Sequence, residues 1–272
     1  MPRCGVGGFI GGQTTPCGRS ICGMDVDRAG AAISGELARS GDPAKKEWWQ
    51  SYLKGAIVFH GVPMGQVRRI VHAAVGPEAD PDSVIELARL LIEGQIAEEK
   101  LAGILLLAEM APPDVILHRL EVVARMFDDG HIFDWNTCDW MCVKVLGSVV
   151  AAGGSEAAEA IAAWRDAPGL WRRRASMVGL VPVVGEGDGT IAGLTRLAIE
   201  TCASHVDDDR RFIQTGIGWT LRELSTAEPG AVEAFLRRHQ PALSREAVRM
   251  GAARLSDPVR ADFGISGPRR RR

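Results

Sequence analysis

The stretch EEKLAGILLLAEMAPPDVILHRLEVVARMF, residues 98–127, decides the fold class of this chain. Apolar residues recur at helical spacing on both sides of APPD, as expected for two amphipathic helices. The two prolines fall between the helices, where they break no helical hydrogen bond. The regular alternation of apolar and polar residues that marks a strand is missing from this stretch. It therefore predicts a pair of helices joined by a short link.

The same pattern continues from about Asp42 toward the C-terminus, with breakers such as GPEADPD, DDG, APG and AEPG between the helical segments. Asp82 and Ser244 are predicted N-caps of two of these helices. A helical bundle or an α-solenoid would both satisfy such a pattern. The number of helices exceeds what one four-helix core holds, so we predict an all-α fold, an α-solenoid of stacked helix pairs with a concave face for a long ligand.

Composition limits the class of protein. Of the 272 residues, 46% are hydrophobic and 24% are charged, which is typical of a soluble globular protein. No apolar run reaches the roughly 18 residues of a membrane span, and we see no secretory signal, so we expect a cytoplasmic protein with reduced cysteines. Cys4, Cys17 and Cys22 are conceivable zinc ligands. Because a tight CxxC pair and a nearby fourth ligand are missing, we expect no metal site.

Charge is distributed unevenly along the chain. From Arg210 to Arg272 there are 13 Arg and Lys against 6 Asp and Glu, although the whole chain has a net charge of −2. A basic C-terminal third suggests a surface that faces a polyanion. The alternative is a solvated helix face followed by a disordered tail. We divide the chain into a flexible N-terminal extension (1–40), within which a short helix near Arg28–Ala38 fits the pattern, a helical-repeat domain (41–262) and a basic tail (263–272).

One candidate site lies in FDWNTCDWMC, residues 133–142. If this stretch is helical, Trp135 and Asp139 are i and i+4 and share one face, whereas Trp140 is turned away and packs in the core. A carboxylate beside an indole suits a site that stabilises positive charge. Alternatively, these are ordinary helix-start aspartates, and Asp134 is a cap.

Two further segments combine aromatic rings with arginines. In LWRRRA, successive residues of Arg172–Arg174 turn by about 100° on a helix, so at least one guanidinium points toward a groove or helix junction. Such a group suits phosphate binding, and salt bridges to a neighbouring helix are the alternative. In FIQTGIGWTLRELS, Gly216 and Gly218 allow a neighbour or ligand to come close, and Trp219 shares a face with Arg222.

Together these motifs resemble the DNA alkylation repair enzymes of HEAT-like repeat fold, the AlkD-type DNA glycosylases. The resemblance covers about residues 45–255, and its pieces run in family order. They are SYLKGAIVFHGVPMGQVRR (51–69), KLAGILLLAE (100–109), WNTCD (135–139), LWRRRA (170–175), FIQTGIGWTLRELS (212–225) and PALSREAVR (241–249). Asn136 departs from the pattern by replacing the usual acidic residue, and Trp140 is an extra tryptophan.

The resemblance implies a HEAT-like solenoid with a concave DNA-binding face. Its motifs also imply a site, in which each family residue is matched to one position of this sequence. The family's catalytic aspartate falls on Asp139, and its two sugar-contacting tryptophans fall on Trp135 and Trp219. The residues predicted to contact DNA are Tyr52, Lys54, Arg173, Arg174 and Arg222. The implied activity is hydrolysis of the N-glycosidic bond of cationic N3- or N7-alkylated purines, with no metal and no cofactor.

We therefore expect a monomeric, nucleoid-associated glycosylase that acts on double-stranded DNA containing alkylated purines and has no membrane partner. Asp139 would stabilise the cationic sugar and position water, between indole faces that also favour the cation. A non-catalytic helical-repeat protein that binds damaged or branched DNA is the alternative. A protein-binding scaffold ranks third, because it gives the basic C-terminal third no purpose.

Overall fold

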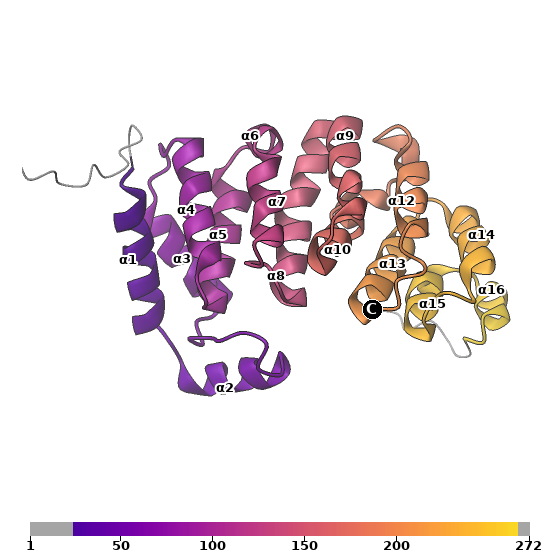
Figure 1. Cartoon of the computed structure of the whole chain (residues 1–272), viewed down its shortest axis with the longest axis horizontal. Coiled ribbons are helices and arrows are strands. Elements are labelled where there is room, and N and C mark those ends of the chain that lie inside the picture. The colour runs from indigo at the N-terminus through magenta and orange to yellow at the C-terminus, as the bar shows by residue number, and fades with distance from the viewer. Residues whose placement is uncertain (1–23, 266–272) are drawn as a thin grey trace, which may run out of the picture.

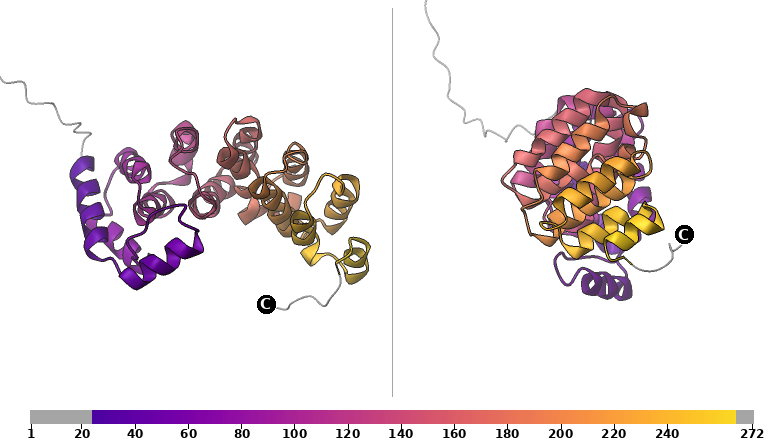
Figure 2. Two further views of the ribbon diagram at one scale, coloured as in Figure 1. Left: turned by 60° about the horizontal axis from the view of Figure 1, so that its bottom comes forward. Right: turned by 90° about the vertical axis from the view of Figure 1, so that its right-hand side faces the viewer.

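A computed structural model describes residues 24–265, and every regular element among them is a helix or a helical turn. Figure 1 shows the helices arrayed in chain order along the long axis of the molecule. Figure 2 shows that the helices stack side by side in more than one layer instead of surrounding one central core. The predicted all-α class and α-solenoid architecture are therefore confirmed.

Sixteen α-helices and four shorter helical segments make up the described residues. The N-terminal helices are α1 (Val26–Arg39), α2 (Pro43–Tyr52), α3 (Met64–Ala74), α4 (Pro81–Glu93), α5 (Ala97–Met110), α6 (Pro113–His118) and α7 (Leu120–Asp128). The central ones are α8 (Trp135–Trp140), η1 (Met141–Leu146), α9 (Gly147–Ala162), η2 (Ala163–Asp166), α10 (Leu170–Val178), α11 (Val181–Val184) and η3 (Gly187–Gly189). The C-terminal ones are α12 (Leu194–Ala203), α13 (Arg211–Leu224), α14 (Pro229–His239), α15 (Arg245–Gly251), η4 (Ala252–Arg254) and α16 (Asp257–Asp262).

The array is held together by apolar contacts between neighbouring helices. The main pairs are α4 with α5, α6 with α9, α10 with α13, and α13 with α15. One hydrophobic core runs through all of them, from Ile33 in α1 to Leu255 after η4. Because each helix buries its apolar stripe against the next pair, burial along the whole length stabilises the solenoid.

The N-terminal boundary differs from the one predicted. Helix α1, within the segment expected to be a flexible extension, packs against α3 and α4, and its Ile33 and Leu37 are fully buried. Asp25 caps this helix by accepting a hydrogen bond from the backbone N–H of Arg28. The folded array therefore begins at α1 and not at residue 41. Residues 1–23 and 266–272, which include Cys4, Cys17, Cys22 and the terminal arginines, lie outside the described residues.

One of the two predicted helix caps is confirmed. Ser244 caps α15, because its hydroxyl oxygen accepts from the backbone N–H of Ala247 at 3.1 Å. Asp82 was the wrong choice for α4. The cap is Asp80, which accepts from the backbone N–H of Ser83 at 3.0 Å. Pro81 explains the earlier start, since proline is favoured at the first position of a helix.

Helix α2 stands apart from the rest of the array. It buries none of its own side chains and projects below the stacked helices in Figure 1. Trp49 anchors it by packing on Phe59, with ring centroids 5.6 Å apart. The loop that follows is fixed by the buried carboxylate of Glu98, which accepts backbone hydrogen bonds from His60, Gly61 and Val62 at 3.0, 2.7 and 3.0 Å. The projecting helix is therefore held in one position.

The continuous helical stretch Trp135–Asp166 is long and apolar enough to cross a membrane by length and composition alone. Half of its most apolar window is buried inside the array. It carries α8, η1 and α9, whose side chains Val145, Val149 and Ile161 are fully buried in the common core. We read it as a core segment of the solenoid.

Candidate functional site

The local structure around Asp139 is set by the cap of α8. The buried carboxylate of Asp134 accepts hydrogen bonds from the backbone N–H groups of Asn136 and Thr137, at 2.9 and 3.1 Å. The Thr137 hydroxyl donates to its second oxygen at 2.6 Å. This cap starts the helix at Trp135, which puts Trp135 and Asp139 one turn apart on the same face. The predicted cap and the predicted shared face are both present.

Directly after α8, six residues form a π-helix, η1 (Met141–Leu146). A π-turn contains more residues than an α-turn, so it shifts the faces of the helix that follows. Within it, Cys142 and Leu146 are fully buried, while Lys144 is exposed. Such insertions are frequent at functional sites. Here the turn places a core-facing segment immediately behind the carboxylate of Asp139.

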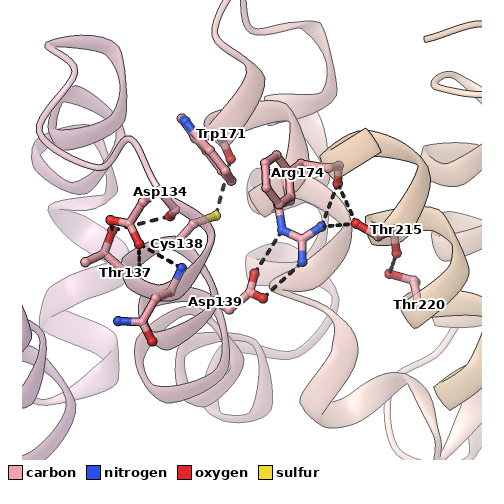
Figure 3. A network of polar contacts seen from close by, with 11 residues as sticks. Asp134, Thr137, Cys138, Asp139, Trp171, Arg174, Thr215 and Thr220 are labelled. Atoms are coloured by element: carbon pink, nitrogen blue, oxygen red, sulfur yellow. Dashed lines mark hydrogen bonds and ion pairs between the residues drawn. The ribbon is translucent and has the colours of Figure 1, made fainter. Parts of the chain in front are cut away.

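Asp139 and Arg174 form a two-pronged ion pair (Figure 3). The Nε of Arg174 donates to Oδ1 of Asp139 at 2.9 Å, and Nη2 donates to Oδ2 at 3.0 Å. The remaining nitrogen, Nη1, donates to the backbone oxygen of Phe212 at 2.6 Å and to the Thr215 hydroxyl at 3.2 Å. The guanidinium thereby ties α8 and α10 to α13, and the position of the carboxylate is fixed from three helices.

Burial controls the protonation of this pair. Burial raises the pKa of the Asp139 carboxyl above its ordinary value; Arg174 lowers that pKa, and Asp134 raises it further. For Arg174, burial lowers the pKa but Asp139 outweighs it, so the guanidinium pKa is raised. Because a guanidinium stays charged in proteins, we assign an ionised pair at neutral pH whose carboxyl takes up a proton more readily than an exposed aspartate does.

The two glycines of α13 explain how this packing is possible. A Cβ atom on Gly216 would lie 3.4 Å from Nη1 of Arg174 and 3.2 Å from Met177. A Cβ on Gly218 would lie 2.9 Å from the backbone oxygen of Ala247 in α15. The close approach predicted at these positions is therefore made by neighbouring helices of the same chain.

The three successive arginines of α10 point to three different carboxylates. Arg172 pairs with Asp128 at 2.5 Å, Arg173 with Asp208 at 3.1 Å, and Arg174 with Asp139. This is the salt-bridged alternative that the sequence left open. The structure corrects the view of Arg174 as a free phosphate contact, since only 5% of its side chain is exposed and its nitrogen atoms already donate to partners. Arg173 lies outside the cleft described next.

A cleft of about 780 Å³ lies in front of the ion pair. Its walls come from the end of α2 and the loop after it, from α8 and α10, and from α13 and α15. All predicted site residues except Arg173 line it, namely Tyr52, Lys54, Trp135, Asp139, Arg174, Trp219 and Arg222. Segments that lie far apart in the sequence therefore meet around one carboxylate.

Basic side chains surround the opening of this cleft. Arg222 lies over the Trp219 ring at 6.0 Å and pairs with Glu223, and Arg211 pairs with Glu246. Lys54 has no carboxylate partner in the described part of the chain. Exposed ion pairs contribute only about 0–1 kcal/mol, so Arg211, whose side chain is 67% exposed, can exchange its carboxylate for a phosphate at little cost. The rim can therefore receive a polyanion.

The sequence predicted only part of the surroundings of Trp140. It packs against the main core, as predicted, but it is only half buried and also lines a second hollow of about 310 Å³ beside Asp139. Trp135, Trp219 and Lys144 line the same hollow, and the Lys144 ammonium lies 5.8 Å from the Trp140 ring centroid. A helical wheel puts Trp140 about 100° from Asp139, so its ring can border the hollow beside Asp139 while it also contacts the core.

Comparisons with known proteins identify the family and the fold. The family model described as DNA alkylation repair enzyme matches residues 33–255. The chain belongs to this family. A solved structure, described as a predicted DNA alkylation repair enzyme from Enterococcus faecalis, superposes with a TM-score of 0.67 at 21% identity. The match covers 80% of this chain and 98% of that one, and at this identity it concerns the fold. No curated protein matches the chain.

Membership of the DNA alkylation repair enzyme family indicates a role in the repair of alkylated DNA. The matched region begins inside α1 and ends after η4, so it includes every helix that lines the cleft. Within residues 24–265 no group of three or more His, Cys, Asp or Glu side chains is arranged to hold a metal ion. The candidate site of this family member is thus the carboxylate, the indoles and the basic rim.

Proposed function

We propose that this chain is a DNA glycosylase that hydrolyses the N-glycosidic bond of cationic N3- or N7-alkylated purines. The observation that carries the proposal is a carboxylate, Asp139, held at a fixed position in a cleft that two indoles and a basic rim also line. We further propose that the protein acts as a monomer on duplex DNA in the cytoplasm, in association with the nucleoid.

The chemistry follows from the charge of the substrate. An N3- or N7-alkylated purine is already cationic, so it can leave with the bonding electrons of the C1′–N9 bond as a neutral base. The deoxyribose then carries positive charge at C1′ and O4′. Asp139 stabilises that charge and orients a water molecule, whose oxygen bonds to C1′ while its proton passes to the carboxylate or to solvent. The products are the free alkylpurine and an abasic site.

The two tryptophans and Arg174 have separate roles in this proposal. The faces of Trp135 and Trp219 pack against the sugar and favour its developing positive charge. Arg174 is a positioning residue that holds the carboxylate by two hydrogen bonds. Each carboxylate oxygen has two lone pairs, so those facing the cleft remain available. Tyr52, Lys54 and Arg222 are proposed to contact the DNA around the lesion, the cations through its phosphates.

A non-catalytic protein that binds damaged DNA is the second candidate, and one observation favours it. Both oxygens of Asp139 accept hydrogen bonds from Arg174, so the carboxylate is already neutralised within the protein. A purely structural ion pair would show the same geometry. On this reading the cleft binds DNA and releases no base.

The test is single-turnover release of 7-methylguanine from a DNA duplex, with the abasic product measured by strand scission in alkali. We expect wild-type protein to release the base and Asp139→Asn to be slower by about two to three orders of magnitude, the scale expected for loss of a charge-stabilising group. Asp128→Asn is the matched control. Asp128 pairs with Arg172, which lies in α10 as Arg174 does, but Asp128 does not line the cleft. It should release base at the wild-type rate.

The outcomes separate the two candidates. Binding of the duplex without base release by any of the three proteins would support the non-catalytic one. Equal release by wild type and Asp139→Asn would contradict the role given to the carboxylate. Thermal unfolding of each variant, followed by circular dichroism, ensures that the compared proteins are folded.

A further inference from the structure

Helix α2 contributes only its last residue, Tyr52, to the site described above. It buries none of its own side chains and stands off the stacked helices in Figure 2. We propose that α2 and the turn after it, residues 43–54, form an arm that holds the DNA duplex a few nucleotides away from the lesion. This α2 arm contacts the sugar–phosphate backbone and leaves the bases stacked. The inference rests on the proposed action on duplex DNA and deepens it.

The exposed rings of α2 are the first argument. Trp48 and Tyr52 are 62% and 60% exposed, more than any other large hydrophobic residue among residues 24–265. They lie one helical turn apart, and their rings stack on each other, parallel to within 3° with centroids 5.5 Å apart. The stack still leaves most of both side chains in solvent, and apolar surface left exposed in this way marks an interaction site. Such rings can pack against the C–H groups of deoxyribose.

The charge of the α2 arm favours a polyanion as the partner. Residues 43–54 carry three lysines against one glutamate, in a chain whose net charge is −2. Lys45 lies three positions before Trp48, and therefore on the same side of the helix. It pairs with Asp42, but both side chains are exposed, so a phosphate can replace this carboxylate at little cost. Cations beside apolar rings match the phosphates and sugars of a nucleic acid backbone.

The backbone of Lys54 is an independent observation. Its φ of 53° lies in the left-handed region, and no other non-glycine residue among residues 24–265 has a positive φ. Glycine or asparagine is usual at such a position after a helix, because other side chains are strained there. Strained residues persist mainly where function requires them. A cation that lines the cleft is thus kept where a glycine would be less strained.

The α2 arm is held beside the cleft at a fixed distance. Trp49 anchors it by packing on Phe59. The Trp48 and Tyr52 ring centroids are 5.5 Å apart, and the Tyr52 ring lies edge-on to Trp135 at 5.8 Å. Successive phosphates of one strand are about 3.4 Å apart along the duplex axis, so these two steps span about three nucleotides at most. The arm therefore reaches DNA next to the sugar proposed to lie at Trp135.

The experiment measures how affinity depends on the DNA that flanks the lesion. Each duplex carries one tetrahydrofuran, an abasic-site analogue, and each flank in turn is cut from about eight to about two base pairs, less than the reach of the arm. Wild type should lose at least about 10-fold in affinity when one of the two flanks is cut, the scale of burying one large aromatic side chain. Trp48→Ala should bind the long duplex as weakly as wild type binds the short one, with no further loss on the cut.

Lys54→Asn tests the strained cation without breaking the fold, because asparagine also adopts the left-handed conformation. Thermal unfolding should show it to be at least as stable as wild type. The slope of log Kd against log salt for the long duplex should nevertheless fall by about one. Lys46→Asn is the matched control, since Lys46 is an exposed lysine two positions before Trp48, on the opposite side of the helix. It should keep the wild-type slope.

The outcomes separate the α2 arm from the glycosylase. Equal affinity of wild type for long and short duplexes, or a flank dependence that Trp48→Ala retains, would overturn the arm and leave the glycosylase proposal intact. Equal slopes for Lys54→Asn and Lys46→Asn would contradict the contact made by Lys54. A flank dependence that requires Trp48, in a protein that releases no 7-methylguanine, would keep the arm and refute the glycosylase.

Discussion

The α4–α5 pair and the α10–α13 pair are both buried helix contacts, but they are built differently. Between α4 and α5 the contact is mostly apolar, with Leu87, Ile104 and Leu105 almost fully buried. Two charged groups are also buried at the start of α5, Glu98 and Lys100, and both bond to backbone groups. The α10–α13 contact instead buries Arg174 and Gln214 in the middle of the array. Buried polar groups are costly unless they are fully hydrogen-bonded. The first pair thus bonds its buried charges to backbone groups away from the cleft, whereas the second holds an ion pair whose carboxylate faces the cleft.

Gln214 shows how the polar contact is kept satisfied. Its NH₂ group donates to the backbone oxygens of Val206 and Asp208, and its carbonyl oxygen accepts from the backbone N–H of Ser244 at 2.8 Å. A half-satisfied network would be worse than an apolar one. The complete bonding of Gln214 and Arg174 suggests that this region is under constraint from function as well as from folding.

The largest effect is expected from removing the central cation. Arg174→Leu leaves the mostly buried carboxylate of Asp139 without its partner, so it should destabilise the protein by about 3–5 kcal/mol and abolish base release. Arg172→Leu should cost less, because the Arg172–Asp128 pair is more exposed, at 20% and 31%. Urea unfolding curves measure the free energy of unfolding of both variants. A small loss of stability in Arg174→Leu would remove the contrast between the two helix pairs.

The apolar pair should respond in stability alone. Leu105→Ala in α5 creates a cavity and should destabilise by about 2–5 kcal/mol, since Leu105 is 1% exposed. Base release per folded molecule should stay at the wild-type level, because α5 does not line the cleft. A selective loss of activity in folded Leu105→Ala would show that the two regions are coupled.

Alanine substitutions at the two glycines of α13 should differ in their effect on stability, because one glycine packs against a neighbouring helix backbone and the other against the side chains at the site. Gly218→Ala puts a methyl group 2.9 Å from the Ala247 oxygen, and overpacking of about 1–3 kcal/mol should outweigh the gain in helix propensity of about 1 kcal/mol. Gly216→Ala meets only the mobile end of Met177 and the edge of Arg174, so its stability should change little. The denaturant midpoints of the two variants measure this difference. An equal loss of stability in Gly216→Ala and Gly218→Ala would contradict the prediction.

The smallest effect is expected at the rim. Arg222→Gln should leave stability nearly unchanged and reduce by about one the slope of log Kd for duplex DNA against log salt, as for one lost phosphate contact. Arg237→Gln is the control, because Arg237 pairs with Glu233 and Asp262 and does not line the cleft. Titrations of each protein with duplex DNA at several salt concentrations measure this slope. Identical slopes for Arg222→Gln and wild type would exclude a phosphate contact at Arg222.

The sequence predicted what depends on local pattern. Helical spacing identified the all-α solenoid, and the i, i+4 relation placed Trp135 beside Asp139. Long-range pairing was out of reach, because spacing does not show which carboxylate Arg174 meets 35 residues away. The π-turn after α8 was also missed, since no residue signal marks it, and the helical wheel of α8 did not show that Trp140 borders a hollow as well as the core. A short helix near Arg28–Ala38 was predicted and is present as α1, but it was placed in a flexible extension, whereas its Ile33 and Leu37 are fully buried in the array.

The central claim is that the cleft stabilises a cationic sugar through the carboxylate of Asp139. Its most direct test is the binding of duplexes that carry either a cationic pyrrolidine or a neutral tetrahydrofuran in place of one nucleotide. Wild type should bind the cationic analogue at least about 100-fold more tightly, as expected for a transition-state mimic, and Asp139→Asn should lose that preference. Equal affinity of wild type for the two duplexes, or a preference that Asp139→Asn retains, would contradict the account.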